Sequence, residues 1–171
     1  IKIMQNSLLT LSRVISAEEE FQIVESKLLI EEALKKLENL VNQYSPDIQY
    51  DNLPRINVSP IQFEAVFKNI IENAIIYHND STKRKIIISV ENVEEKIIFT
   101  IQDNGIGIEK NHQNSVFDIF RRLHAEGAYG GGVGAGLAIT KAIINRHDGI
   151  IWVESTQDKC GTAIKFSIPA H

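Results

Sequence analysis

The chain has 171 residues, of which 43% are hydrophobic and 23% charged, and its formal net charge at pH 7 is −4. This length predicts one domain that buries roughly two-thirds of its unfolded surface, and the mildly acidic balance argues against a nucleic-acid-binding surface. Cys160 is the only cysteine, which excludes an intrachain disulfide and fits a reducing compartment. No apolar run approaches the ~20 residues that span a bilayer.

The first 15 residues carry a helical pattern. Ile1, Met4, Leu8, Leu11 and Ile15 alternate in spacings of three and four, which is typical of an a/d seam of two heptads. Two heptads fit a coiled coil and a helix packed on its own domain equally well. Because the chain starts inside this pattern, we expect it to be a fragment of a longer protein.

The next segment predicts a short strand over 21–24 and then a helix that is capped by Ser26 and ended by Pro46. A strand around 48–50 and a loop through Pro54 follow. The string Ser59-Pro60-Ile61-Gln62 combines a helix cap, a proline at the first helical position and a capping-box glutamine.

We expect the helix that begins at Pro60 to run to about Tyr77. At ~100° per residue its large apolar side chains cluster on one face. These are Phe63, Phe67, Ile70, Ile71 and Ala74. Asn69, Asn73 and Tyr77 follow one another at intervals of four, on a strip displaced from that core face.

The second half of the chain predicts two hairpins and two helices. Strands over 85–91 and 96–102 form the first hairpin, and the second strand delivers Asp103 at its end. Strands over 150–155 and 162–168 form the second hairpin.

One of the two helices begins near Asn114, and the other runs from about Ala135 to His147, with Gly149 as its left-handed end residue. Helices and strands mix without strict alternation, so the fold class is α+β.

Asp103 opens the string DNGIGI (103–108). Asp-Asn-Gly alone is most often a surface turn, but here Gly105 and Gly107 alternate with Ile106 and Ile108. We expect the glycines to let the backbone approach a flat ligand while the isoleucines anchor the loop inward. A carboxylate at this place accepts a hydrogen bond from an exocyclic amine, which separates adenine from guanine.

Three further features point to a nucleotide. An amide oxygen, as on Asn69 or Asn73, is a hard neutral ligand for Mg²⁺, and a triphosphate supplies the negative charge. Tyr77 either flanks the base or belongs to the core. The glycine cluster 130–136 matches neither a P-loop nor, without a preceding strand, a dinucleotide fingerprint. It still presents N–H groups at a helix start to phosphates, and the features together predict an ATP site.

The ordered motifs resemble the ATP-binding catalytic domain of sensor histidine kinases, in the GHKL superfamily that also holds gyrase-type topoisomerases, mismatch-repair ATPases and a heat-shock chaperone. They are Asn-x-x-x-Asn, DNGIGI, VFDIFRRLH, GGVGAGLAI and GTAIKFSIP. The string RHDGIIWVES (146–155) is most similar to the phytochrome-like branch of bacterial kinases. The resemblance covers roughly residues 20–169.

The resemblance implies a two-layer α/β sandwich of the Bergerat type, with a mixed, mostly antiparallel sheet on three helices. Residues 1–18 would be the end of a dimerisation helix and 19–171 the catalytic domain. ATP and Mg²⁺ would be the ligands. The partners would be the dimerisation and phosphoacceptor helices of the same protein and a response regulator. The parent would be a homodimer in the cytoplasm, either soluble or membrane-anchored.

The resemblance also assigns roles to single residues. Asp103 would bind adenine N6, Asn73 would ligate Mg²⁺, and Asn69 and Arg122 would approach the phosphates as catalytic residues. The other implied nucleotide contacts are Tyr77, Gly105, Gly107, Arg121, Gly132, Gly134, Gly136, Leu137 and Thr162. The resemblance implies a lid that spans about Arg121 to Gly134. Six glycines lie from Gly127 to Gly136, so we expect the part over 125–134 to become ordered only with nucleotide.

Two departures from the family pattern stand out. Many members carry a basic residue where this chain has Ile76, which removes a phosphate contact. The chain also has no histidine followed by an acidic and then a basic residue, which is the phosphoacceptor pattern. We therefore do not expect it to autophosphorylate alone.

Two alternatives remain beside a histidine kinase domain. One is an anti-sigma-type serine kinase, and the other is a degenerate module that binds nucleotide weakly, which Ile76 favours. Asn69 favours the kinase, because hydrolytic relatives carry a glutamate there to activate water. Glu72 is an alternative base on another part of the helix.

Overall fold

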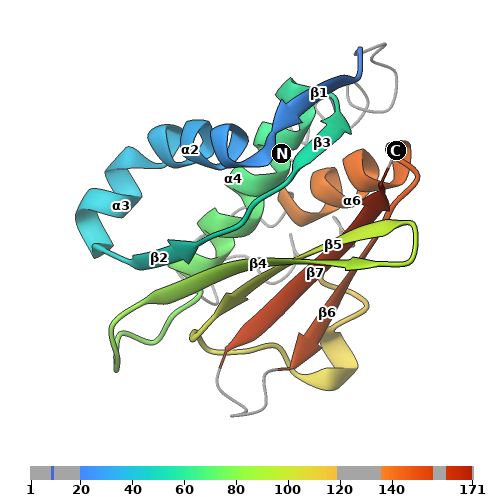
Figure 1. Ribbon diagram of the computed structural model, residues 1–171. Coiled ribbons are helices and arrows are strands. Elements are labelled where there is room, and N and C mark those ends of the chain that lie inside the picture. Colours follow the sequence, from blue (N-terminus) through green and yellow to red (C-terminus); the bar gives the residue numbers. More distant parts are fainter. Residues whose placement is uncertain (1–8, 10–19, 119–135, 156–160, 171) are drawn as a thin grey trace.

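The computed structural model of the chain describes residues 9, 20–118, 136–155 and 161–170. A five-stranded sheet forms one layer, and the longer described helices lie together on one side of it (Figure 1). The helices are α2 (Ser26–Lys36), α3 (Glu38–Tyr44), α4 (Pro60–Ile76) and α6 (Gly136–Arg146). The expected α+β sandwich is confirmed, and the short α3 adds a fourth helix to the expected three. Apart from Leu9, the predicted helix over 1–18 lies outside the described residues.

The large sheet has the strand order β2-β4-β5-β7-β6. Its strands are β2 (Asp47–Tyr50), β4 (Lys85–Val93), β5 (Lys96–Asp103), β6 (Ile150–Ser155) and β7 (Thr162–Pro169). β2 is parallel to β4 and every other pair is antiparallel. A separate antiparallel pair joins β1 (Gln22–Glu25) to β3 (Arg55–Val58). Both predicted hairpins are present, although residues 156–160 between β6 and β7 lie outside the described part.

The sheet buries one face. On β4 the side chains of Ile86 and Ile88 are buried, whereas Ile87 between them is 36% exposed. This alternation follows from the two-residue period of a strand, although the run of three isoleucines suggests burial on both faces. Ile86 and Ile88 belong to the core that also holds the buried apolar side chains of α2, α4 and α6, and the helical layer covers one side of the sheet (Figure 1).

α4 packs on the sheet through an aromatic cluster. Phe63 and Phe67 of α4 contact Phe166 of β7 at ring-centroid distances of 5.9 Å each. Phe67 also meets Phe99 of β5 edge-on at 5.5 Å, and Phe99 stacks on Phe166 at 5.0 Å. All four rings are fully buried, so the predicted apolar face of this helix is confirmed.

Only one of the two hydrogen bonds of the predicted capping box forms at the start of α4. Ser59 Oγ accepts a hydrogen bond from the Gln62 N–H at 3.4 Å, as expected of the cap. The reciprocal bond from Ser59 N–H goes instead to Nε2 of His147, at 3.0 Å. His147 Nδ1 in turn donates to the Ile143 carbonyl at 2.8 Å. This buried histidine therefore joins the end of α6 to the start of α4.

Three predictions in the first sixty residues were wrong. Ser26 does not cap its helix, because it is buried and its hydroxyl donates to the Pro54 carbonyl. The single helix predicted to Pro46 is interrupted at Leu37, whose N–H is shared between two preceding carbonyls. The segment 55–58, expected as part of a loop, is strand β3, because pairing with β1 supplies its backbone hydrogen bonds.

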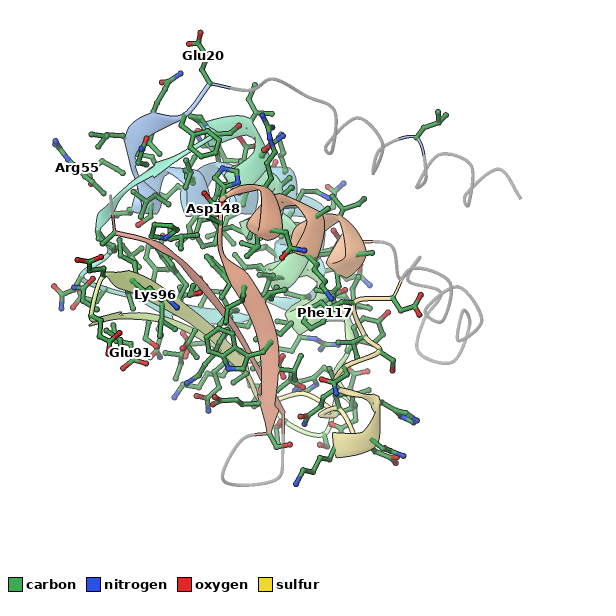
Figure 2. The ribbon with its side chains drawn as sticks, turned by 90° about the vertical axis from the view of Figure 1, so that its right-hand side faces the viewer. Glu20, Arg55, Glu91, Lys96, Phe117 and Asp148 are labelled. Atoms are coloured by element: carbon green, nitrogen blue, oxygen red, sulfur yellow. The ribbon has the colours of Figure 1, made fainter. Side chains whose placement is uncertain are left out.

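Two further differences lie in the second half. Residues 113–117 form turns after the 3₁₀ turn η1 (Lys110–His112), so no helix begins near Asn114 within the described residues. At the end of α6 the left-handed residue is Asp148, with φ of 58°, and not Gly149. Figure 2 labels Asp148 at this end of α6.

Gly149 is required at the end of α6 for a steric reason. A Cβ atom on this residue would lie 2.0 Å from the carbonyl oxygen of Ser167 on β7. Its N–H donates to the Ile144 carbonyl at 3.0 Å, which completes a Schellman-type ending. The glycine therefore lets the chain turn from α6 into the sheet edge. None of the described helices is both long and apolar enough to cross a bilayer.

Gly149→Ala should destabilise the fold by about 2 kcal/mol or more, because a methyl group against a strand carbonyl forces the backbone apart. Thermal and urea unfolding of the chain measure this. Gly136→Ala is the matched control, since a Cβ atom there meets nothing closer than 3.4 Å. Equal unfolding midpoints for Gly149→Ala and the unmodified chain would contradict the steric argument.

Candidate nucleotide-binding site

Asp103 lies at the end of β5, held by two backbone donors. Its Oδ1 accepts hydrogen bonds from the N–H groups of Gly105 at 2.9 Å and Thr162 at 3.1 Å. Burial raises the pKa of this carboxyl from 3.8 to about 6, and the two backbone hydrogen bonds offset only part of that rise. The side chain is thus a desolvated acceptor, already oriented by the protein backbone.

The glycines of the DNGIGI loop let this loop pack closely against the backbone of other segments. A Cβ atom on Gly105 would lie 2.2 Å from the Tyr77 carbonyl oxygen, and Gly107, with φ of 78°, faces the Gly161 carbonyl. The Tyr77 carbonyl also accepts the Ile106 N–H at 3.2 Å. The loop is therefore hydrogen-bonded to the end of α4. Tyr77, Gly105 and Gly107 consequently lie beside Asp103. Approach of these glycines to a ligand stays a prediction.

Two residues of this cluster have roles that the sequence analysis missed. Asn104 Oδ1 accepts the Lys85 N–H and its Nδ2 donates to the Lys83 carbonyl, both at 2.8 Å. It thereby fixes the start of β4 beside Asp103. Gly161, with φ of 94°, would bring a Cβ atom within 2.1 Å of the Asp103 carbonyl oxygen. The Asn-Gly turn signal and the glycine before β7 were the available clues.

Asn73 and Asn69 lie on α4 at increasing distance from this cluster. Asn69 and Asn73 are both half-buried. Asn69 Nδ2 donates to the Gly136 carbonyl at 3.2 Å, at the start of α6. The Asn73 side chain forms no hydrogen bond within the described residues.

The strip spans the length of a nucleotide. Each step from Asn69 to Asn73 to Tyr77 advances about 6 Å along the helix axis, so the ends of the strip are about 12 Å apart. One end lies against the Asp103 loop through Tyr77, and the other lies against the first turn of α6 through Asn69. An extended nucleotide with its base at Asp103 would reach the start of α6 with its phosphates.

The remaining predicted site residues divide into two groups. Gly136 begins α6 beside Asn69. Leu137 is 2% exposed and its side chain belongs to the hydrophobic core. Arg121, Arg122, Gly132 and Gly134, together with the predicted lid over 125–134, lie outside the described residues.

Metal binding by acidic side chains alone has no basis in the described residues. They contain no group of three or more His, Cys, Asp or Glu side chains placed to hold an ion. Glu72, the alternative base, is paired with Lys68 at 3.1 Å. The amide oxygens on the strip belong to Asn69 and Asn73, and oxygens of this kind would suit a cation that arrives with its own phosphate ligands.

A family model described as "Histidine kinase-, DNA gyrase B-, and HSP90-like ATPase" matches residues 58–171. The chain belongs to this family. The matched segment begins at the end of β3 and contains Asn69, Asn73 and Asp103. The family expected from the sequence motifs is thereby confirmed.

Several family members are similar over nearly the whole chain. It is 37% identical to cyanobacterial phytochrome B of Nostoc sp. over 158 residues, which are 92% of the chain and 21% of that protein. It is 34% identical to the sensor histidine kinase WalK of Bacillus subtilis over 174 residues, which cover 96% of the chain and 28% of that protein. The solved histidine kinase AdeS of Acinetobacter baumannii superposes with a TM-score of 0.74 at 25% identity, over 98% of the chain and 77% of that chain.

The likeness to phytochromes agrees with the branch expected from RHDGIIWVES. The chain spans about a fifth of the length of the phytochrome relatives it matches. The family match to residues 58–171 makes this part of the chain ATPase-like.

Asp103→Asn should stabilise the fold at high pH. The folded carboxyl has its pKa raised from 3.8 to about 6, so its stabilising contribution is complete below pH 3.8 and is lost as pH rises through 6. The amide has no such dependence. The melting temperature of the variant minus that of the unmodified chain should therefore be larger at pH 8 than at pH 4. A pH-independent difference would show that this carboxyl titrates normally.

Proposed function

We propose that this chain is the ATP-binding catalytic domain of a two-component sensor histidine kinase. The observation that carries the proposal is the placement of Asp103 at one end and Asn69 at the other end of a strip on α4, with Asn73 between them. The desolvated carboxylate of Asp103 suits the exocyclic amine of adenine. The family to which the chain belongs is named for its ATPases.

Magnesium would be held at the middle of this strip. The half-buried amide of Asn73, which has no partner among the described residues, fits a hard cation whose other ligands are phosphate and water oxygens. The cation would neutralise charge on the phosphates. The first turn of α6 beside Asn69 would supply backbone N–H groups to the same phosphates.

Phosphotransfer to a protein histidine needs no base that activates water, and the described strip on α4 offers none. The strip carries amides and no carboxylate, and the nearby Glu72 is engaged by Lys68. In the proposed reaction, a histidine nitrogen on a dimerisation helix forms a bond to the γ-phosphorus while the bond to the bridging oxygen breaks and ADP leaves. The parent protein would be a cytoplasmic dimer, soluble or membrane-anchored, and would pass the phosphoryl group to a response regulator.

The proposal requires that the chain bind ATP through Asp103. Asp103→Asn should weaken ATP binding by about 1–3 kcal/mol, because a charge-assisted hydrogen bond is replaced by a mismatched amide. Isothermal calorimetry with Mg-ATP and Mg-GTP measures both the affinity and the preference for adenine. Asp51→Asn, in the exposed turn after β2, is the matched control. Unchanged ATP affinity in the Asp103 variant would exclude this carboxyl as the adenine-binding group.

Asn73→Ala should abolish phosphotransfer in the full-length parent while the fold is retained, because the side chain lies off the buried face of α4. The measurement is incorporation of label from γ-labelled ATP, with circular dichroism as the check on folding. Asn92→Ala, on an exposed part of β4, should label at the normal rate. Normal labelling of the Asn73 variant would exclude this residue as the magnesium ligand.

A further inference from the structure

Thr140 and Asn69 share a hydrogen-bonded contact between α6 and α4. Thr140 is fully buried on α6. Its hydroxyl donates to the Gly136 carbonyl at 2.8 Å and accepts from Asn69 Nδ2 at 3.4 Å. Asn69 Nδ2 donates a second hydrogen bond to the Gly136 carbonyl, at 3.2 Å. Two oxygen atoms of one helical turn therefore face the same amide nitrogen.

This contact decides which end of the Asn69 amide faces α6. A backbone carbonyl only accepts hydrogen bonds, so the group opposite the Gly136 carbonyl has to be the nitrogen. The Thr140 hydroxyl has already given its proton to the same carbonyl, so it too presents a lone pair to Asn69. In the flipped amide, Oδ1 would face the Gly136 carbonyl and that hydrogen bond would be lost, and the Thr140 hydroxyl could donate to Oδ1 only by giving up its own bond to Gly136.

The orientation leaves Oδ1 as the acceptor that Asn69 can offer to a ligand. A Cβ atom on Gly136 would lie 3.5 Å from this oxygen and 3.4 Å from Cγ. A side chain at 136 would therefore lie in van der Waals contact with the amide. Asn73, one turn along α4, has a side chain without a hydrogen bond within the described residues.

We propose that Thr140 is a positioning residue for magnesium nucleotide: together with the Gly136 carbonyl, its hydroxyl holds the Asn69 amide so that Oδ1 would face the magnesium held at Asn73 or a water bound to that ion. The proposal rests on the function proposed above and extends it. An amide oxygen attracts a cation or its bound water, whereas the NH₂ group repels both. Thr140 does not touch the nucleotide and acts only through Asn69.

A purely structural role for Thr140 would be the hydrogen bond that a buried threonine hydroxyl on a helix commonly donates to the carbonyl four residues earlier. Thr140→Val removes the hydroxyl with little change in volume, and Thr140→Ser retains it. The hydrogen bond to Gly136 alone predicts an effect on stability. The positioning role also predicts an effect on metal-dependent binding, which separates the two.

The experiment measures ATP affinity of the 171-residue chain by calorimetry, once with excess Mg²⁺ and once with EDTA. Thr140→Val should weaken Mg-ATP binding about three- to tenfold, the size of one ordinary hydrogen bond, and should leave binding in EDTA unchanged. Thr140→Ser should restore the Mg-ATP affinity. Thr100→Val, on the sheet strand β5, is the matched control and should bind as the unmodified chain does.

A second readout needs no nucleotide. The side-chain NH₂ resonances of Asn69, identified by their loss in Asn69→Ala, should shift in Thr140→Val and return in Thr140→Ser. An unchanged magnesium dependence in Thr140→Val would overturn the proposal, as would an equal loss of affinity with and without Mg²⁺. An unmodified chain that binds no ATP in either condition would overturn the proposed function itself, which is a different result from both.

Discussion

The packing of α4 on strands β5 and β7 is the contact on which the candidate site depends. Phe63 and Phe67 lie against Phe99 and Phe166, with the ring centroids of contacting pairs between 5.0 and 5.9 Å apart. Aromatic rings that are fully buried resist sliding, because any shift opens voids in a close-packed core. Asn69 lies in the next part of the same helix, so its distance from the end of β5 is determined by this packing.

The Asp103 end of the site is assembled from backbone groups of three segments. The carboxyl accepts N–H bonds from its own loop and from the start of β7, and the loop is fastened to the Tyr77 carbonyl at the end of α4. These contacts orient the carboxyl but do not replace the water it has lost, so its pKa stays raised at about 6. The protein thus keeps this candidate binding group in a state that costs stability near neutral pH.

Helices α4 and α6, which meet at Asn69, are also joined where α4 begins and α6 ends. His147 at the end of α6 accepts the Ser59 N–H at the start of α4, and burial lowers the pKa of its ring. Phe21, before β1, stacks on this ring at a centroid distance of 4.3 Å. α4 and α6 are therefore held at one end by His147 and near the other by Asn69 and Thr140. These two contacts fix the position of α6 relative to the strip of Asn69, Asn73 and Tyr77 on α4.

Local patterns in the sequence determined the parts of the protein that depend on near neighbours. The helical period of α4 predicted both its buried face and the polar strip, and the motif order predicted the family, because side-chain direction follows from residue spacing within one element. Contacts across the chain decided the rest. β3 is a strand only because β1 pairs with it, and the cap of α4 is completed by a histidine 88 residues away. The Asn69 amide nitrogen meets the Gly136 carbonyl and the Thr140 hydroxyl, 67 and 71 residues later. A spacing rule within one element cannot foresee these contacts, because tertiary packing determines which distant groups meet a given donor or acceptor.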